Sequence, residues 1–285
     1  CDDDRLMRLW EGLGYYSRAR NLKKCAKKLM EFYDGKLPEN FQHLMVLPGI
    51  GPYTAGAIAS IAFNLPAPAI DGNVLRVLTR YYGIIEDIRL PKVKKMIEEK
   101  LNDFYSCKQP NLSYASFNQG IMELGETICV PNGAPQCTKC PLNKNCYAYQ
   151  NQMTDRIPYR SSLKDRKILE RTLFIIRDDQ SFLIHKRPQE GLLAGLYEFP
   201  GVDAHLTKSE MISHIESLGF TPLRITTLPE AKHIFTHLEW HMRAYEIKVA
   251  EIQHPLDEHY YLVNKKELQS LAIPSAFRKY TDWYS

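Results

Sequence analysis

The 285-residue sequence lacks the features that mark several special classes of protein. It has no internal repeat and no low-complexity tract. Its longest apolar stretch, residues 55–70, is interrupted by Asn64, Pro66 and Pro68, so this stretch cannot span a membrane. No basic-then-apolar leader opens the sequence, so nothing in it signals secretion. With 44% hydrophobic and 25% charged residues, the composition is that of a globular protein and excludes collagen, a disordered chain and a disulfide-stapled miniprotein.

Positive charge is modest and unevenly distributed. Residues 1–150 contain 19 Lys/Arg against 15 Asp/Glu, residues 151–168 contain 5 against 2, and residues 169–285 contain 13 against 16. The basic front part and middle segment are compatible with a polyanionic partner, but an ordinary solvated surface explains the same excess.

The first half of the chain has the apolar spacing of helices, punctuated by glycines. Two sets of residues with this spacing are Leu6, Leu9, Trp10 and Leu13, and Leu22, Cys25, Ala26 and Leu29. Pro91 is placed to open a further helix that runs to about Tyr105.

The residue composition of the chain changes after Cys146. Residues 150–168 are polar and basic and predict an interdomain linker between a helical domain, residues 1–149, and a compact α+β domain, residues 169–285. The expected elements of the second domain are a hairpin of strands 173–176 and 182–184, a helix between the capping box at Thr207 and Gly219, and a strand over residues 240–247.

A glycine-rich turn lies at Leu47–Ala57, where Gly49 and Gly51 stand two residues apart. Such a turn lets a DNA phosphate approach backbone amides at the start of the following helix. Such binding to the phosphate does not depend on the base sequence. An ordinary corner between two helices is the alternative, and the two glycines alone do not decide between them.

Asp71 opens another expected helix at Asp71–Arg76. A plain N-cap, which stabilises a helix by about 1 kcal/mol, explains an aspartate at this place. A catalytic carboxylate is the second interpretation, and one residue can fill both roles.

Four of the seven cysteines lie close together, at Cys129, Cys137, Cys140 and Cys146. This density indicates a metal centre in a reducing compartment and not a disulfide framework. The spacing contains a single C-x2-C knuckle, and by itself it leaves zinc and an iron–sulfur cluster nearly balanced.

These segments together resemble the adenine DNA glycosylase (MutY) family of the helix-hairpin-helix base-excision superfamily. The resemblance is carried by residues 9–21, the glycine hairpin, residues 69–76 and the cysteine loop 129–146. It implies a helical helix-hairpin-helix glycosylase domain with a [4Fe-4S] loop, followed by a Nudix-like α+β domain. The implied reaction extrudes adenine paired with 8-oxoguanine, or with guanine, and hydrolyses its N-glycosidic bond.

The resemblance also implies roles for individual residues. Asp71 is the catalytic carboxylate beside the sugar, Asn73 orients that carboxylate or the sugar, and Tyr53 lines the adenine site. The lyase relatives carry a lysine amine where this chain has Tyr53, so we expect a monofunctional glycosylase without a Schiff-base route. Gly49 and Gly51 bind DNA, and the four cysteines hold the cluster, although the first gap of the loop is one residue longer than the family's usual gap.

The family pattern extends further toward the N-terminus than this sequence does. That preceding part carries the glutamate that protonates the departing adenine and the glutamines that wedge into the base stack. Acid catalysis contributes about 10²–10⁴-fold. We therefore expect a fragment of a longer gene product, or a decayed reading frame, with severely impaired activity.

The second domain resembles a Nudix fold in residues 183–201. A Nudix hydrolase needs Arg and several Glu on the next helix to hold Mg²⁺, and here only Glu210 and Glu216 remain, so we expect the fold without the hydrolysis. The family's short reader of 8-oxoguanine matches Phe235, Thr236 and His237. A histidine-rich hairpin with ordinary core aromatics is the alternative.

Three functions therefore compete: an adenine glycosylase, a lesion-binding module without turnover, and a Nudix-type nucleotide pyrophosphatase. The resemblance implies duplex DNA as the partner, no membrane, a monomer, and a bacterial protein associated with the nucleoid in the cytoplasm. A sliding clamp or a mismatch-repair protein as a further partner is left open.

Overall fold

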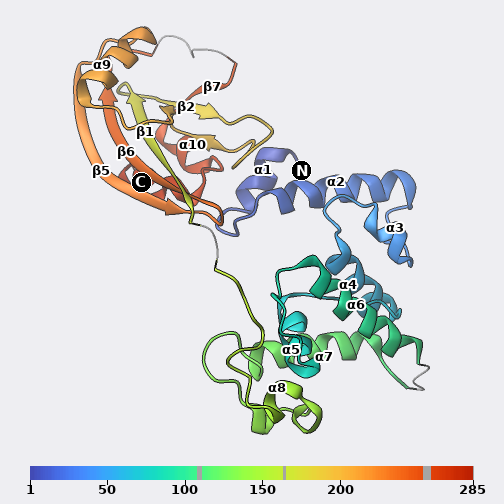
Figure 1. The fold of residues 1–285 in the computed structure, drawn as a ribbon. Helices are drawn as coiled ribbons and strands as arrows, with labels where there is room; N and C mark the ends of the chain where they lie inside the picture. The colour runs from blue at the N-terminus through green and yellow to red at the C-terminus, as the bar shows by residue number, and fades with distance from the viewer. Residues whose placement is uncertain (108–110, 163–164, 253–257, 285) are drawn as a thin grey trace. The chain divides into compact units, whose positions relative to one another are not determined.

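The computed structural model describes residues 1–107, 111–162, 165–252 and 258–284 and divides into two compact units (Figure 1). The helical unit is Asn21–Leu163. The sheet unit combines Cys1–Arg20 with the chain from Lys164 onward. The grouping of residues 1–20 with the sheet differs from the expected limits of 1–149 and 169–285, which stay predictions about independently folding domains.

The helical unit is built from short helices that pack on one another (Figure 1). In chain order they are α2 (Ser17–Phe32, which begins in the sheet unit), α3 (Phe41–Met45), α4 (Pro52–Phe63), α5 (Gly72–Tyr82), α6 (Pro91–Ser106), α7 (Tyr114–Thr127), η1 (Cys137–Lys139), η2 (Asn143–Asn145) and α8 (Tyr147–Gln150). The expected helices around residues 22–29 and 91–105 are confirmed.

Local chemistry explains where these helices begin. Asn40 caps α3 by accepting from His43 N, and Asp71 caps α5 in the same way. Pro52 and Pro91 occupy the first turns of α4 and α6, where their missing N–H group costs no helical bond.

The sheet unit contains a mixed sheet with the strand order β3-β2-β1-β6-β5, in which β4 also pairs with β1 and β7 with β2. Its elements are α1 (Asp3–Leu9), β1 (Lys167–Arg177), β2 (Phe182–Lys186), β3 (Tyr197–Glu198), β4 (Gly201–Val202), α9 (Lys208–Ser217), β5 (Arg224–Ile234), β6 (Leu238–Lys248), β7 (Tyr260–Val263), α10 (Lys265–Ser270), η3 (Ser275–Phe277), α11 (Arg278–Thr281) and η4 (Asp282–Tyr284). The central strands β1 and β6 run parallel, and the other pairs are antiparallel.

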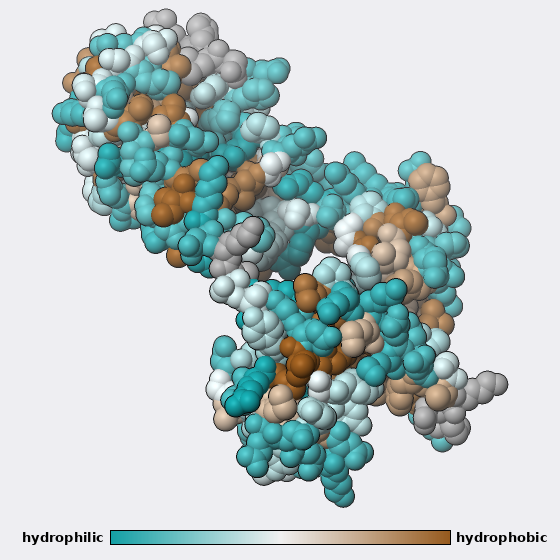
Figure 2. All heavy atoms as spheres, in the orientation of Figure 1, coloured by the Kyte–Doolittle hydropathy of each residue, from teal (hydrophilic) through white to brown (hydrophobic). Residues whose placement is uncertain are grey.

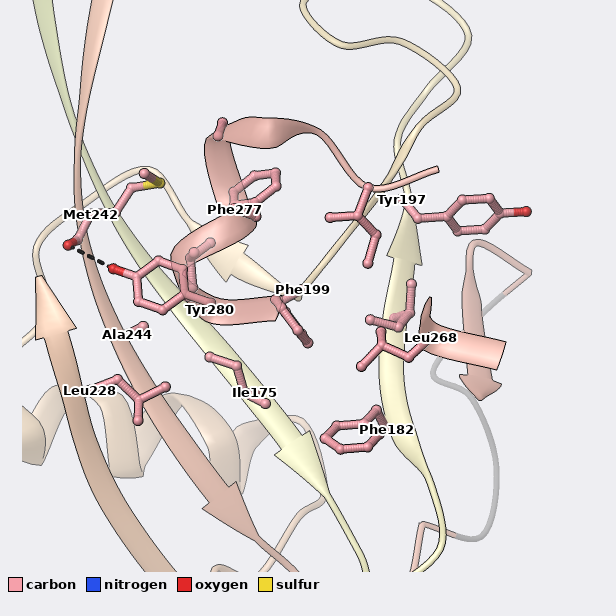
Figure 3. Packing of buried hydrophobic residues seen from close by; sticks show 14 of the residues in the cluster. Ile175, Phe182, Tyr197, Phe199, Leu228, Met242, Ala244, Leu268, Phe277 and Tyr280 are labelled. Carbon is pink, nitrogen blue, oxygen red and sulfur yellow. Dashed lines mark hydrogen bonds between the residues drawn. The ribbon is translucent and has the colours of Figure 1, made fainter. Parts of the chain in front are cut away.

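Helices cover both faces of this sheet because successive side chains of β1 point to opposite sides. Leu173 and Ile175 join one core with Phe277 and Tyr280, whose hydroxyl donates to the Met242 carbonyl at 3.2 Å (Figure 3). The alternate residues of β1 face a second core under α9. That core includes Phe174, Ile176, Met211 and Ile215. Continuous burial of residues 171–176 in β1 thus follows from a sheet with two covered faces.

The expected local features of the second domain are confirmed. Arg177 and Phe182 pair across the first hairpin, and Asp178 Oδ1 accepts from the backbone of Gln180 and Ser181 in its turn. Thr207 forms a capping box at the start of α9.

The first helix is shorter than its apolar spacing predicts. α1 ends at Leu9, before Leu13, because Gly12 and Gly14 adopt φ values of +84° and +63° and turn the chain. The helix is attached to the sheet through Asp4, which accepts from Lys186 Nζ at 2.8 Å and from the Tyr197 hydroxyl at 3.0 Å.

The expected linker 150–168 contains a part that packs on the helical unit, and its residues 163 and 164 lie outside the described residues. Ile157 is 1% exposed, and its carbonyl accepts from Arg80 Nε at 2.7 Å. The Tyr159 carbonyl accepts from Ile88 N at 3.0 Å. We call residues 154–161 the strap.

Both units show a mainly hydrophilic surface with separate apolar groups in the view of Figure 2. Among the described residues, none of the helices combines the length and apolar character that a membrane span requires.

Candidate functional site

The glycine hairpin joins α3 to α4 in the helical unit. Leu47 is buried in the core between these helices and Ile50 packs against it, so the turn is fixed from inside. Gly49 has a φ of +80°, and a Cβ there would lie 2.6 Å from Asn21 Cβ, so this position requires glycine. Gly51 is the N-cap of α4. Because it has no side chain, it makes no capping hydrogen bond to the backbone N–H groups of the first turn. These amides, at the positive end of the helix, suit a phosphate oxygen.

Tyr53 lies in the first turn of α4, and its side chain is 42% exposed. A phenol at this position has no amine with which to form an imine.

Both carboxylate oxygens of Asp71 have fixed partners. Oδ1 accepts from the backbone of Val74 at 2.7 Å as the N-cap bond of α5. Oδ2 accepts from Asn73 Nδ2 at 3.1 Å. The cap is therefore confirmed, and the same bonds hold the carboxylate in one orientation. Of the two roles expected for Asn73, orienting the carboxylate or orienting the sugar, this hydrogen bond suits the first.

The loop that leads to Asp71 is held from two sides. Asn118 on α7 is 2% exposed, and its side chain accepts from Ala69 N at 3.2 Å and donates to the Ala67 carbonyl at 3.1 Å. A Cβ on Gly56 of α4 would lie 2.1 Å from the Pro68 carbonyl oxygen. The loop therefore lies directly against the backbone of α4, and only glycine permits this contact.

Arg76 connects Asn73 to the cysteine loop. Its Nη2 donates to Asn73 Oδ1 at 2.7 Å and to the Gly125 carbonyl at 2.5 Å, and its Nε donates to the Cys129 carbonyl at 2.7 Å. The side chain is buried, and burial lowers the pKa of Arg76 below its ordinary value. These acceptors satisfy a guanidinium that would otherwise be costly to bury.

Arg80 lies one turn further along α5 and is also buried. Its Nη1 is 3.1 Å from Cys129 Sγ, and its Nη2 donates to the Thr154 carbonyl at 3.0 Å. The carbonyl of Arg80 itself accepts from Cys146 Sγ at 3.6 Å. Arg80 therefore places a positive charge beside the first cysteine and binds the loop to both α5 and the strap.

The four cysteines line one small cavity of about 20 Å³. Burial raises the pKa of Cys137 and of Cys140, and the neighbouring cysteines raise that of Cys137 further, so these thiols favour the neutral form until a metal displaces the proton. Within the described residues no three Cys, His, Asp or Glu side chains are arranged around one metal ion. Four cysteines that line one cavity are a donor set suited to thiolate-bound metals, which include zinc and iron–sulfur clusters.

The residues proposed to read 8-oxoguanine form the turn between β5 and β6 in the sheet unit. Phe235 N donates to the Leu238 carbonyl at 2.8 Å and closes this turn. The Phe235 ring packs edge-on against His233 and Trp240, at centroid distances of 4.6 and 4.9 Å. Phe235 is thus partly a core residue, as the alternative interpretation expected, whereas Thr236 and His237 are exposed at the tip. Burial lowers the pKa of His233, which favours its neutral form.

This turn borders a cavity of about 630 Å³ within the sheet unit. Its other walls come from Gly12–Ser17, Leu192 and Leu193, and Pro274–Ala276. The Tyr15 hydroxyl lies 3.3 Å from Thr236 Oγ1 across the cavity. Tyr15 is 71% exposed and has a φ of +47°, a strained backbone for an aromatic residue that is typical of functional sites.

Among the described residues of the second domain, no three acidic, histidine or cysteine side chains are grouped as a Mg²⁺ site requires. Glu210 closes the capping box of α9 by accepting from Thr207 N at 2.8 Å and from its hydroxyl at 2.7 Å. Glu198 is buried and paired with Arg171 at 3.2 Å and with Arg187 at 2.7 Å. Both carboxylates are therefore engaged with neighbouring side chains or backbone.

Sequence reasoning assigned no role to Tyr15, Arg76, Arg80 or Asn118. Tyr15 and Arg76 stood in segments that carried the resemblance, but their partners are 221 and 53 residues away along the chain. Nothing in the local pattern identifies such distant contacts.

Two family models match the chain. Residues 1–106 match the HhH-GPD superfamily base excision DNA repair protein, and residues 171–283 match the NUDIX domain. A solved thermostable thymine-DNA glycosylase is 30% identical, with a TM-score of 0.45 over 52% of this chain and 65% of that chain.

Curated relatives with one name align over most of the chain. The adenine DNA glycosylase of Buchnera aphidicola subsp. Acyrthosiphon pisum is 31% identical over 278 residues, which are 97% of this chain and 77% of that protein. The adenine DNA glycosylase of Buchnera aphidicola subsp. Schizaphis graminum is 38% identical over 73% of this chain and 59% of its own length. The human adenine DNA glycosylase is 31% identical over 85% of this chain and 53% of its own length. The chain therefore spans between about half and three quarters of these relatives and belongs to the adenine DNA glycosylase family.

Proposed function

We propose that this chain acts on duplex DNA as a monofunctional adenine glycosylase of base-excision repair. Its substrate is adenine paired with 8-oxoguanine or with guanine, and it hydrolyses the N-glycosidic bond of the extruded adenine. The orientation of the Asp71 carboxylate by Asn73 and Val74, on a loop held by Asn118, carries this proposal.

Asp71 acts at the sugar. Loss of adenine leaves positive charge on the ring, and a fixed carboxylate stabilises that charge or attacks the carbon that bears it. Overall, water supplies a hydroxyl group to the sugar carbon and a proton to the departing adenine. Tyr53 provides no amine, so the DNA strand stays intact after the base has left.

The hairpin with Gly49 and Gly51 binds a backbone phosphate and reads no sequence. In the sheet unit, Thr236 and His237 offer polar groups to the edge of the opposite base, and Tyr15 offers an exposed ring on which that base stacks. The cavity of about 630 Å³ between these groups supports recognition of a purine there.

Cys129, Cys137, Cys140 and Cys146 would hold a [4Fe-4S] cluster. Bound there, the cluster would stabilise the loop. Arg80 beside Cys129 offsets the negative charge of the thiolates.

The test is release of adenine in single turnover from a labelled duplex that carries adenine opposite 8-oxoguanine. Release from this duplex, with none from one that pairs adenine with thymine, supports the proposal. Trapping with borohydride should give no stoichiometric protein–DNA adduct. Tight, selective binding without any release would instead favour the lesion-binding module.

A further inference from the structure

A basic pocket lies on the helical unit, and Gly72, which follows Asp71, forms part of its lining. It is a pocket of about 530 Å³ lined by Gly72, Leu75, Ile88, Arg89, Leu90, Pro91, Lys94 and Arg160. Its three cationic side chains come from three segments: the loop before α6, the helix α6 and the strap. None of these described lining residues is acidic.

Hydrogen bonds fix the frame of the pocket. The Asp87 carboxylate accepts from Arg89 N at 3.0 Å and from Ser161 N at 3.2 Å, which ties the loop to the strap. Arg89 Nη1 donates to the Ser161 carbonyl. Its bonds with Ser161, followed by the one from Arg89, lower the pKa of Asp87, so this carboxylate stays ionised in that role.

Arg89 lies beside the Asp87 carboxylate, whereas the other two cations of this pocket lack a carboxylate partner among the described residues. The neighbouring lysines of α6 do have partners: Lys92 pairs with Glu86 at 3.6 Å, and Lys95 pairs with Glu99 at 3.9 Å. Within the described part of the chain, Lys94 and Arg160 have no such partner. Like charges gathered without a counter-charge attract an anion.

We propose that this pocket binds a backbone phosphate of the DNA strand that carries the extruded adenine. The inference rests on the proposed function, because Gly72 directly follows Asp71 in the chain. A strand whose sugar reaches Asp71 must carry its neighbouring phosphate past this residue. Gly72 is exposed, with open space where a Cβ would stand, so the strand can approach the backbone. The apolar side chains of Leu75 and Leu90 offer a floor for the adjoining deoxyribose.

The experiment measures the affinity of the full chain for an undamaged duplex over a series of salt concentrations. Each phosphate contact contributes about 0.9 to the slope of log K against log salt. We expect Arg160→Gln and Lys94→Gln each to reduce the slope by up to about that amount. The matched control, Lys95→Gln, removes a charge from the next residue of α6, and we expect it to leave the slope unchanged. Thermal melting of each variant verifies that it is folded.

Three outcomes would overturn the inference while DNA binding by the unaltered chain still supports the proposed function. Unchanged slopes for both pocket variants are the first. Equal losses for Lys95→Gln and the pocket variants, which indicate general charge alone, are the second. The third is calorimetric binding of inorganic phosphate that Arg160→Gln abolishes without any effect on the DNA slope, which would assign the pocket to a free ion. An unaltered chain that binds no DNA would instead refute the proposed function itself.

Discussion

Asn73 donates a hydrogen bond from its side-chain amide to Asp71 Oδ2 at 3.1 Å. The same amide group accepts from Arg76, so its orientation is determined on both sides. An oriented carboxylate meets developing charge without first having to rotate, which is how preorganised groups accelerate a reaction.

Asn73→Ala should therefore slow adenine release. Loss of one hydrogen bond to a charged group costs about 1.5–3 kcal/mol, which corresponds to roughly 10- to 100-fold in the single-turnover rate. The control Asn102→Ala changes an exposed residue of α6 and should leave the rate unaltered. Equal single-turnover rates for the two variants would show that Asn73 has no role in the reaction.

Arg80→Lys should reduce the iron that the purified protein retains. A lysine keeps the charge but cannot reach Cys129 Sγ, Ile157 O and Thr154 O at once, as the planar guanidinium does. Iron and sulfide per chain, together with visible absorbance, provide the measurement. Arg156→Lys, at an exposed arginine of the strap, should retain the full amount. A colourless, zinc-loaded protein would contradict the cluster altogether.

Gly56→Ala should destabilise the helical unit. The added methyl group would lie 2.1 Å from the Pro68 carbonyl oxygen, so the loop before Asp71 must move, at a cost of about 1–3 kcal/mol. Gly120→Ala is the matched control, because its methyl group meets open space on an exposed turn of α7. We expect the control to gain about 0.5–1 kcal/mol in unfolding free energy, since alanine favours a helix. Denaturant unfolding measures the free energy of unfolding of both variants. An unchanged value for Gly56→Ala would show that the loop can move without cost.

Glu198→Gln should alter how stability depends on pH. Burial alone would raise the pKa of Glu198, but His185, Arg171 and Arg187 outweigh it and hold the pKa below its ordinary value. The carboxylate thus stabilises the fold above the unfolded pKa of about 4.3, and this contribution is lost as the pH falls through the lower, folded value.

At neutral pH the variant should lose about 3–5 kcal/mol, because it leaves the buried Arg171 without its full counter-charge. Its melting temperature should also fall less steeply than that of the unaltered chain as the pH drops below about 4.3. Glu216→Gln, at an exposed position of α9, should follow the unaltered chain. Parallel curves for all three proteins would refute this role of Glu198.

His237→Ala and Thr236→Ala should each reduce the preference for 8-oxoguanine over guanine opposite adenine. Loss of a hydrogen bond to the base edge corresponds to about 0.5–1.5 kcal/mol, or up to roughly 10-fold in the affinity ratio. Binding to undamaged duplex should change little. Ser213→Ala, at an exposed position of α9, controls for general effects in the same unit. If affinity for both duplexes falls in parallel, the turn contributes to DNA binding without reading the base.

The amino-acid sequence determined the local elements and the family. Helical spacing, the caps at Asp71 and Thr207, the glycine turn and the first hairpin of the sheet are each set by neighbours within a few residues, so they are found where the patterns predict. The exception, α1, ends early because two glycines in left-handed conformations stop a helix that apolar spacing alone would extend.

Only the tertiary structure decided how the candidate sites are assembled. The contact of Arg80 with Cys129, the grip of Asn118 on the loop before Asp71 and the meeting of Tyr15 with Thr236 join segments that are far apart along the chain. Such contacts depend on how the helices and the sheet pack, and packing arises from the whole chain and not from any local pattern. The sequence therefore identified which residues carry the proposed chemistry, and the fold determined which neighbours orient them.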